Sequence, residues 1–169
     1  FIIGIAAALV AAKLIQEFSL RIVAKAINSR GSELGKIIHD ELHTPIYLNV
    51  ALAGIYGTII ISGFEEATKY YLEGTVLTLV ALIWSRALIR MGNKVLEFVK
   101  NAEDSKFDYE FAPVFENLWT AIVVLTAGFW ILTVWEIDVT PFLASAGIIG
   151  IAAGFAAKDT ISNFFGGLA

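Results

Sequence analysis

The C-terminal stretch decides the fold: Thr140-Pro-Phe-Leu-Ala-Ser-Ala-Gly-Ile-Ile-Gly-Ile-Ala-Ala-Gly-Phe-Ala-Ala-Lys-Asp-Thr-Ile-Ser-Asn-Phe-Phe-Gly-Gly-Leu-Ala169. From Phe142 to Ala157 it carries no charge, and glycine and alanine stand where leucine and valine would fill an ordinary lipid-facing span. Each glycine costs a helix up to about 1 kcal/mol relative to alanine. Close helix packing in a membrane commonly offsets that cost, because small residues let two backbones approach. The stretch therefore predicts a membrane helix that packs tightly against neighbours.

A helical projection at about 100° per residue divides this stretch into a ridge and two flanks. The bulky apolar ridge consists of Ala144, Ile148, Ile151 and Phe155. Small residues form one flank with Gly147, Gly150, Gly154 and Ala157, and the other with Ser145, Ala152 and Ala156. Two small sides allow identical copies to join head to tail and close into a ring, with the ridge facing a pore. The alternative is a simple dimerisation helix, since Gly150 and Gly154 alone satisfy the GxxxG pattern.

A polar run, Lys158-Asp-Thr-Ile-Ser-Asn163, follows the apolar part of this helix. Asp, Thr, Ser and Asn side chains compete with the helix backbone for hydrogen bonds. We therefore predict a bend near Asp159–Asn163 and a second short helix that starts at about Asn163. Lys158 continues the ridge, so it would lie at the mouth of the pore.

The segments Ile137-Asp-Val-Thr, Leu143-Ala and Ala156-Ala-Lys-Asp-Thr-Ile-Ser-Asn-Phe-Phe-Gly-Gly, with the Gly/Ala helix between them, resemble the pore helix of the small-conductance mechanosensitive channel (MscS-like) family. The resemblance covers about Ile137 to Ala169. It implies a heptameric channel, gated by membrane tension, that releases ions and small solutes on hypo-osmotic shock. It also implies a pore gate at Ile151 and Phe155, and contacts between neighbouring pore helices at Ala144, Gly147, Ala152 and Gly154. The resemblance implies a bend at Asp159 and a second pivot at Gly167. It further implies that Asn163 affects the passage between conducting and non-conducting states.

The chain departs from the family pattern at three points. The gate positions, often leucine in the family, are Ile151 and Phe155, which changes the width and wetting of the closed pore. Position 158 is lysine where glutamine is common, which bears on ion selectivity. The family carries a large cytoplasmic domain after the pore helix, and we expect that domain to be absent from this chain.

The composition is that of a membrane protein, since 57% of the 169 residues are hydrophobic. The chain has no cysteine, which excludes disulfides and thiolate metal sites. It shows no nucleophile–base pair, no phosphate-cradling loop and no basic surface typical of nucleic-acid binding. We therefore expect neither an enzyme nor a cofactor, and membrane lipids and identical copies as partners.

Five apolar segments predict about five transmembrane helices. They run from Phe1 to about Leu14, from Ile46 to Phe64, from about Tyr70 to Trp84 with an extension to Lys100, from Leu118 to Trp135, and from Phe142 to Ala157. The second segment has no charge and is long enough to cross about 30 Å of hydrocarbon. Aromatic side chains near the ends, at Tyr70, Tyr71, Trp119, Trp130 and Trp135, suit the membrane interfaces.

The charges of the connecting segments predict the orientation. Basic residues gather between the first two spans and after the third, at Arg21, Lys25, Arg30, Lys36, Arg86, Arg90, Lys94, Lys100 and Lys106. The other two connections hold only Lys69. Because basic connections face the cytoplasm, five spans place the N-terminus outside and Ala169 inside. We expect a multi-pass protein of the cell membrane with a cytoplasmic C-terminus.

Two smaller patterns have competing interpretations. Arg86, Arg90 and Lys94 form a stripe at intervals of four residues. Such charges attract anionic lipid headgroups by about 1 kcal/mol each, or they serve only as determinants of orientation. His39 and His43 have the spacing of a zinc pair, but Asp40 replaces the glutamate of the zincin pattern and no third ligand is evident. We interpret that helix as interfacial, without a metal.

The sequence thus predicts an all-α membrane protein that forms a homo-oligomeric ring. Residues 1–136 would be a tension-sensing paddle of four transmembrane helices, and residues 137–169 the pore-lining helix, with Ala144, Ile148 and Lys158 lining the pore beside the gate and Gly147, Gly150, Ala152 and Gly154 packing neighbouring helices. A secondary transporter fragment, built on interrupted helices with polar groups near the midplane, and a non-conducting membrane anchor are the alternatives.

Overall fold

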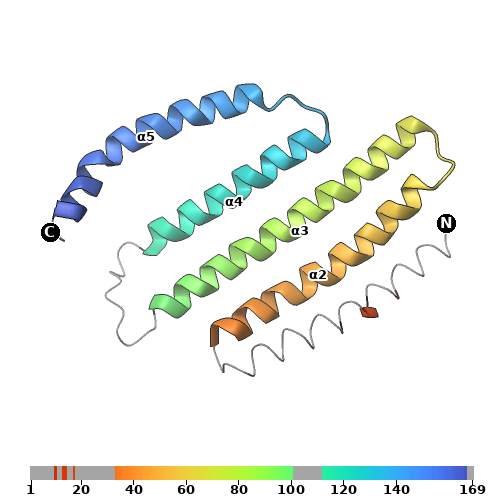
Figure 1. Cartoon of the computed structure of the whole chain (residues 1–169), viewed down its shortest axis with the longest axis horizontal. Coiled ribbons are helices and arrows are strands. Elements are labelled where there is room, and N and C mark those ends of the chain that lie inside the picture. The colour runs from red at the N-terminus through yellow and green to blue at the C-terminus, as the bar shows by residue number, and fades with distance from the viewer. Residues whose placement is uncertain (1–9, 11–12, 15–16, 18–32, 101–111, 167–169) are drawn as a thin grey trace.

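The computed structural model describes residues 10, 13–14, 17, 33–100 and 112–166, and these residues form helices joined by turns without any strand. The helices are α2 (Glu33–Ile60), α3 (Glu66–Lys100), α4 (Ala112–Val134) and α5 (Thr140–Gly166). Consecutive helices run in opposite directions, as Figure 1 shows. The prediction of an all-α chain is confirmed for the described residues.

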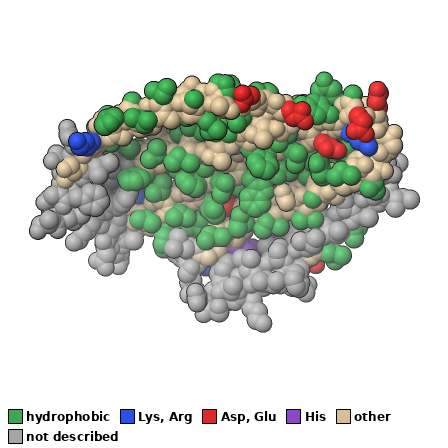
Figure 2. All heavy atoms as spheres, turned by 45° about the horizontal axis from the view of Figure 1, so that its top comes forward, with side chains coloured by type: hydrophobic (Ala, Val, Ile, Leu, Met, Phe, Trp, Pro, Cys, Tyr) green, Lys and Arg blue, Asp and Glu red, His purple; other side chains and the backbone are tan. Residues whose placement is uncertain are grey.

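Three of these helices are long and apolar enough to cross a membrane: α3, α4, and α5 from Thr140 to Lys158. They correspond to the predicted third, fourth and fifth spans. Hydrophobic side chains cover much of the described surface seen in Figure 2. Because little of each span is buried within the chain, that surface needs lipid or further protein around it.

The predicted second span is wrong at its C-terminal end, and the predicted first span lies largely outside the described residues. α2 ends at Ile60, before Phe64, and is not among the three helices long and apolar enough to cross a membrane. Both the backbone N–H and the hydroxyl of Ser62 donate to the carbonyl of Ile59. These bonds satisfy a terminal carbonyl and close the helix in a tight turn, although Ile61 to Phe64 carry no charge.

α4 is fastened to α3 by a tryptophan near each of its ends. The indole N–H of Trp119 donates to the carbonyl of Leu88 at 2.9 Å, and its ring lies directly over Gly92. The indole N–H of Trp135 donates to the hydroxyl of Thr78 at 3.0 Å. A buried indole needs a partner for its N–H, so these two residues, expected only as interfacial anchors, also fix how the helices pack.

Replacing Gly92 by alanine should loosen this packing. A Cβ at position 92 would collide with the indole of Trp119 and displace it from the Leu88 carbonyl. Overpacking of this kind costs about 1–3 kcal/mol, and thermal unfolding in detergent, followed by tryptophan fluorescence, would measure it. The control is Gly57→Ala, because a Cβ at Gly57 meets nothing within 4 Å. That change should stabilise α2 by up to about 1 kcal/mol, and equal unfolding temperatures for the two variants would contradict the prediction.

α5 differs from the other helices because it packs on none of them. Packing contacts join α2 to α3 and α3 to α4, but no described helix packs against α5. A single short connection links it to α4, at the end of the molecule that also carries the α2–α3 turn (Figure 1). The described residues therefore comprise a packed layer of three helices, α2, α3 and α4, and one helix, α5, that packs on none of them.

Candidate functional site

The apolar ridge predicted on α5 is open along its length. Ile148 is 71% exposed, Ile151 64% and Phe155 74%, and Ala144 is also exposed. Fully burying a side chain of this size is worth about 1.5–3 kcal/mol. An isolated protomer would give up that gain at each position. The ridge is therefore a surface available to other copies, lipid or a pore.

The small flanks of α5 are equally free of neighbours from the same chain. A Cβ built on Gly147, Gly150 or Gly154 would meet no heavy atom within 4 Å outside the helix itself. Ala152, on the opposite flank, is exposed. By contrast, Gly74 and Gly92 of α3 each lie against a tryptophan ring. The packing within this protomer therefore accounts for the glycines of α3 but not for those of α5.

The connection between α4 and α5 is held by hydrogen bonds at both of its ends. Glu136 adopts a left-handed backbone with φ 55°, its N–H donates to the Thr133 carbonyl, and the N–H of Ile137 donates to the Leu132 carbonyl. This pair of bonds is the Schellman motif that closes a helix, here with glutamate where glycine is usual. Asp138 Oδ1 then accepts from the backbone N–H of Thr140 at 2.9 Å. The connection between α4 and α5 is thus a short turn that is fixed by hydrogen bonds.

Asp138 also contacts the first turn of α5. The first helical bond of α5 runs from the N–H of Leu143 to the carbonyl of Val139. Thr140 is therefore already inside the helix, and its N–H is satisfied by the carboxylate two residues earlier. An anionic acceptor at this end of a helix is also favoured by the helix dipole.

The hydrogen bond between Asp138 and Thr140 should depend on pH, because it needs the ionised Asp138 carboxylate. The hydroxyl of Thr140, followed by its backbone N–H, lowers the pKa of Asp138 from the usual 3.8. Since the folded-state pKa is depressed, the stabilisation of the first turn of α5 is complete above pH 3.8 and lost as the pH falls through the folded-state value. The backbone amide resonance of Thr140 should therefore shift with a midpoint below pH 3.8. The shift should vanish in Asp138→Asn, and a midpoint at or above pH 3.8 in the unchanged protein would refute the contact.

At its C-terminal end α5 continues without interruption through Gly166. The prediction of a separate short helix starting near Asn163 is wrong, because the polar run keeps its helical backbone. The ribbon of α5 curves, and its last turns point in a different direction from its first (Figure 1). Lys158 is exposed, the side chains of Asp159 and Asn163 are outside the described ones, and Gly167 lies beyond the described residues.

The predicted basic stripe on α3 is divided by the structure. Lys94 Nζ lies 2.6 Å from Glu41 Oε1 of α2, so it joins two helices. Arg86 and Arg90 instead line a pocket of about 260 Å³ between α2 and α3. Sequence reasoning missed both the pocket and the role of Glu41. The local sequence signal is Pro45, which lies inside α2 and removes one backbone donor from that helix.

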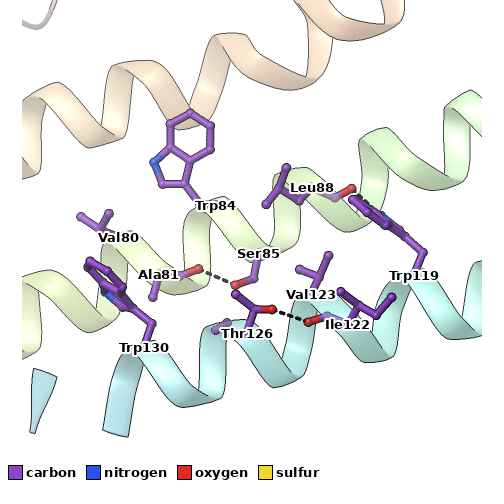
Figure 3. Close-up of a pocket in the computed structure, with 11 residues that line it drawn as sticks. Val80, Ala81, Trp84, Ser85, Leu88, Trp119, Ile122, Val123, Thr126 and Trp130 are labelled. Atoms are coloured by element: carbon purple, nitrogen blue, oxygen red, sulfur yellow. Dashed lines mark hydrogen bonds between the residues drawn. The ribbon is translucent and has the colours of Figure 1, made fainter. Parts of the chain in front are cut away.

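Two further places in the molecule, the His39 region and a cavity between α3 and α4, are weaker candidates for a functional site. His39 Nδ1 lies 3.2 Å from Asp40 Oδ1, and no group of three His, Asp or Glu side chains among the described residues is placed to hold a metal ion. A second cavity, of about 430 Å³, lies between α3 and α4. Its walls are almost wholly apolar, and Figure 3 shows tryptophan side chains around it, among them Trp84, Trp119 and Trp130.

Comparison with known proteins places these features in context. Residues 117–158, which include α4 and most of α5, match the family model "Mechanosensitive ion channel, transmembrane helices 2/3". An uncharacterized MscS family protein of Aquifex aeolicus (strain VF5) is 27% identical over 164 residues, which cover 95% of this chain and 44% of the relative. The uncharacterized MscS family protein YhdY of Bacillus subtilis (strain 168) is 33% identical over 75 residues, which cover 42% of this chain and 20% of the relative.

The chain therefore spans less than half the length of these curated relatives. No solved structure matches it. The family model covers the hairpin that carries the exposed ridge, and the Aquifex relative extends the similarity to nearly the whole chain. The two kinds of match confirm the resemblance to the MscS-like family that the pore-helix sequence indicated.

Proposed function

We propose that the protein is the membrane part of a tension-gated ion channel in which copies of α5 line a common pore. The observation that carries the proposal is the isolation of α5: no described helix packs on it, its ridge is exposed, and a Cβ on Gly147, Gly150 or Gly154 would meet no described neighbour. A ring of identical copies would cover the flanks by helix–helix contact and leave the ridge around a central hole. A dimer through Gly150 and Gly154 would cover only one flank.

In this proposal Ile151 and Phe155 form the gate, with Ile148 and Ala144 lining the pore on one side and Lys158 on the other. Rings of such side chains narrow the pore until water leaves it, and a dewetted constriction blocks ions. The exposure of all three large side chains in the protomer supports this arrangement. We expect Asp159, Asn163 and Gly167 to be the points at which the helix changes direction during gating.

The remaining helices, within residues 1–136, would sense the membrane. Tension favours the state with the larger in-plane area, as a ligand favours the state that it binds better. The two tryptophan contacts make α3 and α4 move together, and the bonded Glu136–Thr140 turn passes that movement to α5. Tilting of this unit would slide the glycine flanks of adjacent helices past one another and withdraw the ridge.

Several finer properties follow from the family resemblance and are part of the proposal. They are a heptameric ring, the release of ions and small solutes on hypo-osmotic shock, and a location in the cell membrane with the C-terminus in the cytoplasm. The charge pattern supports the orientation, because α3 carries Arg86, Arg90, Lys94 and Lys100 toward the end opposite the α2–α3 turn.

Single-channel recording tests the proposed function. The purified protein is reconstituted into liposomes, and excised patches are held under graded suction at fixed voltage. The proposal expects stepwise currents that appear only above a threshold tension. Slow coupled flux without steps would indicate a transporter, silence with correctly inserted protein would indicate an anchor, and either result would overturn the proposal.

A further inference from the structure

A second site, separate from α5, lies in the pocket between α2 and α3. Two contacts fix how these antiparallel helices are aligned: Lys94 to Glu41 at 2.6 Å, and the indole N–H of Trp84 to Asn49 Oδ1 at 3.3 Å. The pocket lies along the helices between these two contacts and has a volume of about 260 Å³. A liquid water molecule occupies about 30 Å³, so the pocket has room for a group larger than a single water.

The walls of the pocket change from polar to apolar along its length. Asp40, Thr44 and Arg90 lie toward the Glu41–Lys94 contact, whereas Leu48 and Ile83 lie toward the Trp84–Asn49 contact. On α2 the polar residues come before the apolar one in the sequence, and on α3 they come after it, because the two helices are antiparallel. A pocket with one polar and one apolar end suits an amphiphile, whose charged head and hydrocarbon begin within a few ångströms of each other.

The charges of the pocket have both signs, and they are not matched to each other. Lys94 neutralises Glu41, whose side chain is only 10% exposed. Arg86 and Arg90 lie one helical turn apart on the α3 wall of the pocket. Among the described residues, neither forms an ion pair. Asp40 is 71% exposed, and its Oδ1 lies 3.2 Å from His39 Nδ1. The pocket thus offers two guanidinium groups that form no ion pair among the described residues and, across from them on α2, one exposed carboxylate.

A phosphate group bound by two arginines gains charge-assisted and bidentate hydrogen bonds. A carboxylate in the same pocket would repel a second anionic group but would attract an ammonium. Pro45 provides a further acceptor for an ammonium. It has no N–H, so the carbonyl of Glu41 lacks its usual helical donor. A primary ammonium has three N–H donors for such acceptors, whereas a quaternary ammonium has none.

We propose that this pocket binds the headgroup of a zwitterionic phospholipid that carries a primary ammonium, the phosphoethanolamine type. Arg86 and Arg90 hold the phosphate, Asp40 and Thr44 hold the ammonium, and the hydrocarbon leaves past Leu48 and Ile83. The site goes beyond the channel function proposed above, since it concerns α2 and α3 and does not depend on whether α5 lines a pore.

Native mass spectrometry of the purified protein tests the site by counting retained lipids. Phosphatidylethanolamine, phosphatidylglycerol and phosphatidylcholine with identical chains are added separately at the same concentration. The proposal expects phosphatidylethanolamine to be retained best. Arg86→Gln and Arg90→Gln should each lower its apparent affinity about tenfold, the loss expected for one hydrogen bond to a charged group. Asp40→Asn should abolish the preference over phosphatidylglycerol while leaving phosphatidylglycerol bound.

The matched control is Lys36→Gln, which removes one positive charge from an exposed position of α2 that does not line the pocket. Circular dichroism verifies that each variant keeps its helices. Equal retention in Lys36→Gln and Arg86→Gln, or equal retention of phosphatidylethanolamine and phosphatidylcholine in the unchanged protein, would overturn the site. Displacement of the lipid by soluble phosphoethanolamine at an equal concentration would overturn its assignment to a lipid.

Discussion

Phe155→Ser should open the channel at lower tension than the unchanged protein. Phe155 is the most exposed of the large ridge side chains, at 74%, and in the proposed ring it closes the pore. Replacing the phenyl group by a hydroxymethyl group removes about 1.5–3 kcal/mol of apolar burial per subunit. It also lets water remain in the constriction. Because every copy contributes, the effect on the closed state is a multiple of that figure. Patch recording under graded suction measures the change in threshold.

The control for Phe155→Ser is Ile149→Ser. Ile149 is 68% exposed in the protomer, nearly as much as Phe155, but it lies about 160° around the helix from Ile151. Loss of apolar surface is therefore similar, whereas only Phe155 would face the pore. A threshold that falls in Phe155→Ser and stays near that of the unchanged protein in Ile149→Ser supports the gate. Equal thresholds in all three proteins would remove Phe155 from it.

Gly154→Leu should prevent the ring from assembling without harming the protomer. Position 154 has open space around it within its own chain, and leucine raises helix propensity by up to about 1 kcal/mol. In a ring the same side chain would be driven into the adjacent α5, at a cost of about 1–3 kcal/mol for each contact between neighbours. Light scattering coupled to size-exclusion chromatography would report the loss as a smaller particle.

Gly128→Leu provides the comparison for this variant. Gly128 is in α4, and a Cβ there also meets nothing within 4 Å of the same chain. The Gly128→Leu variant should keep the particle mass of the unchanged protein, because α4 is not proposed to contact a neighbouring copy through this residue. If Gly154→Leu has the mass and the tension response of the unchanged protein, its flank is not an interface between copies.

The sequence was informative wherever local pattern decides structure. The uncharged or nearly uncharged runs predicted α3, α4 and α5, and the charged extension of α3 to Lys100 was also correct. The family resemblance, drawn from Ile137 to Ala169, was confirmed by the match over residues 117–158. These features depend on periodicity and on short motifs, which require no knowledge of what lies elsewhere in the chain.

The misses have a common physical cause, which is competition between groups that a linear pattern does not rank. Ser62 ended α2 although uncharged residues continue to Phe64. The polar residues after Lys158 stayed helical instead of starting a new helix. Glu41 and Lys94 are far apart in the sequence, so only the folded chain could show that they pair and that Arg86 and Arg90 are left to line a pocket.

One measurement tests the proposed ring of α5 helices most directly. An electron cryomicroscopy map of the purified particle in a lipid nanodisc would show where α5 lies relative to any symmetry axis. The proposal predicts α5 beside that axis, with Ile151 and Phe155 facing it and Gly147, Gly150 and Gly154 against the adjacent copy. A map in which α5 lies away from the axis, or in which Ile151 and Phe155 point into lipid, would contradict it.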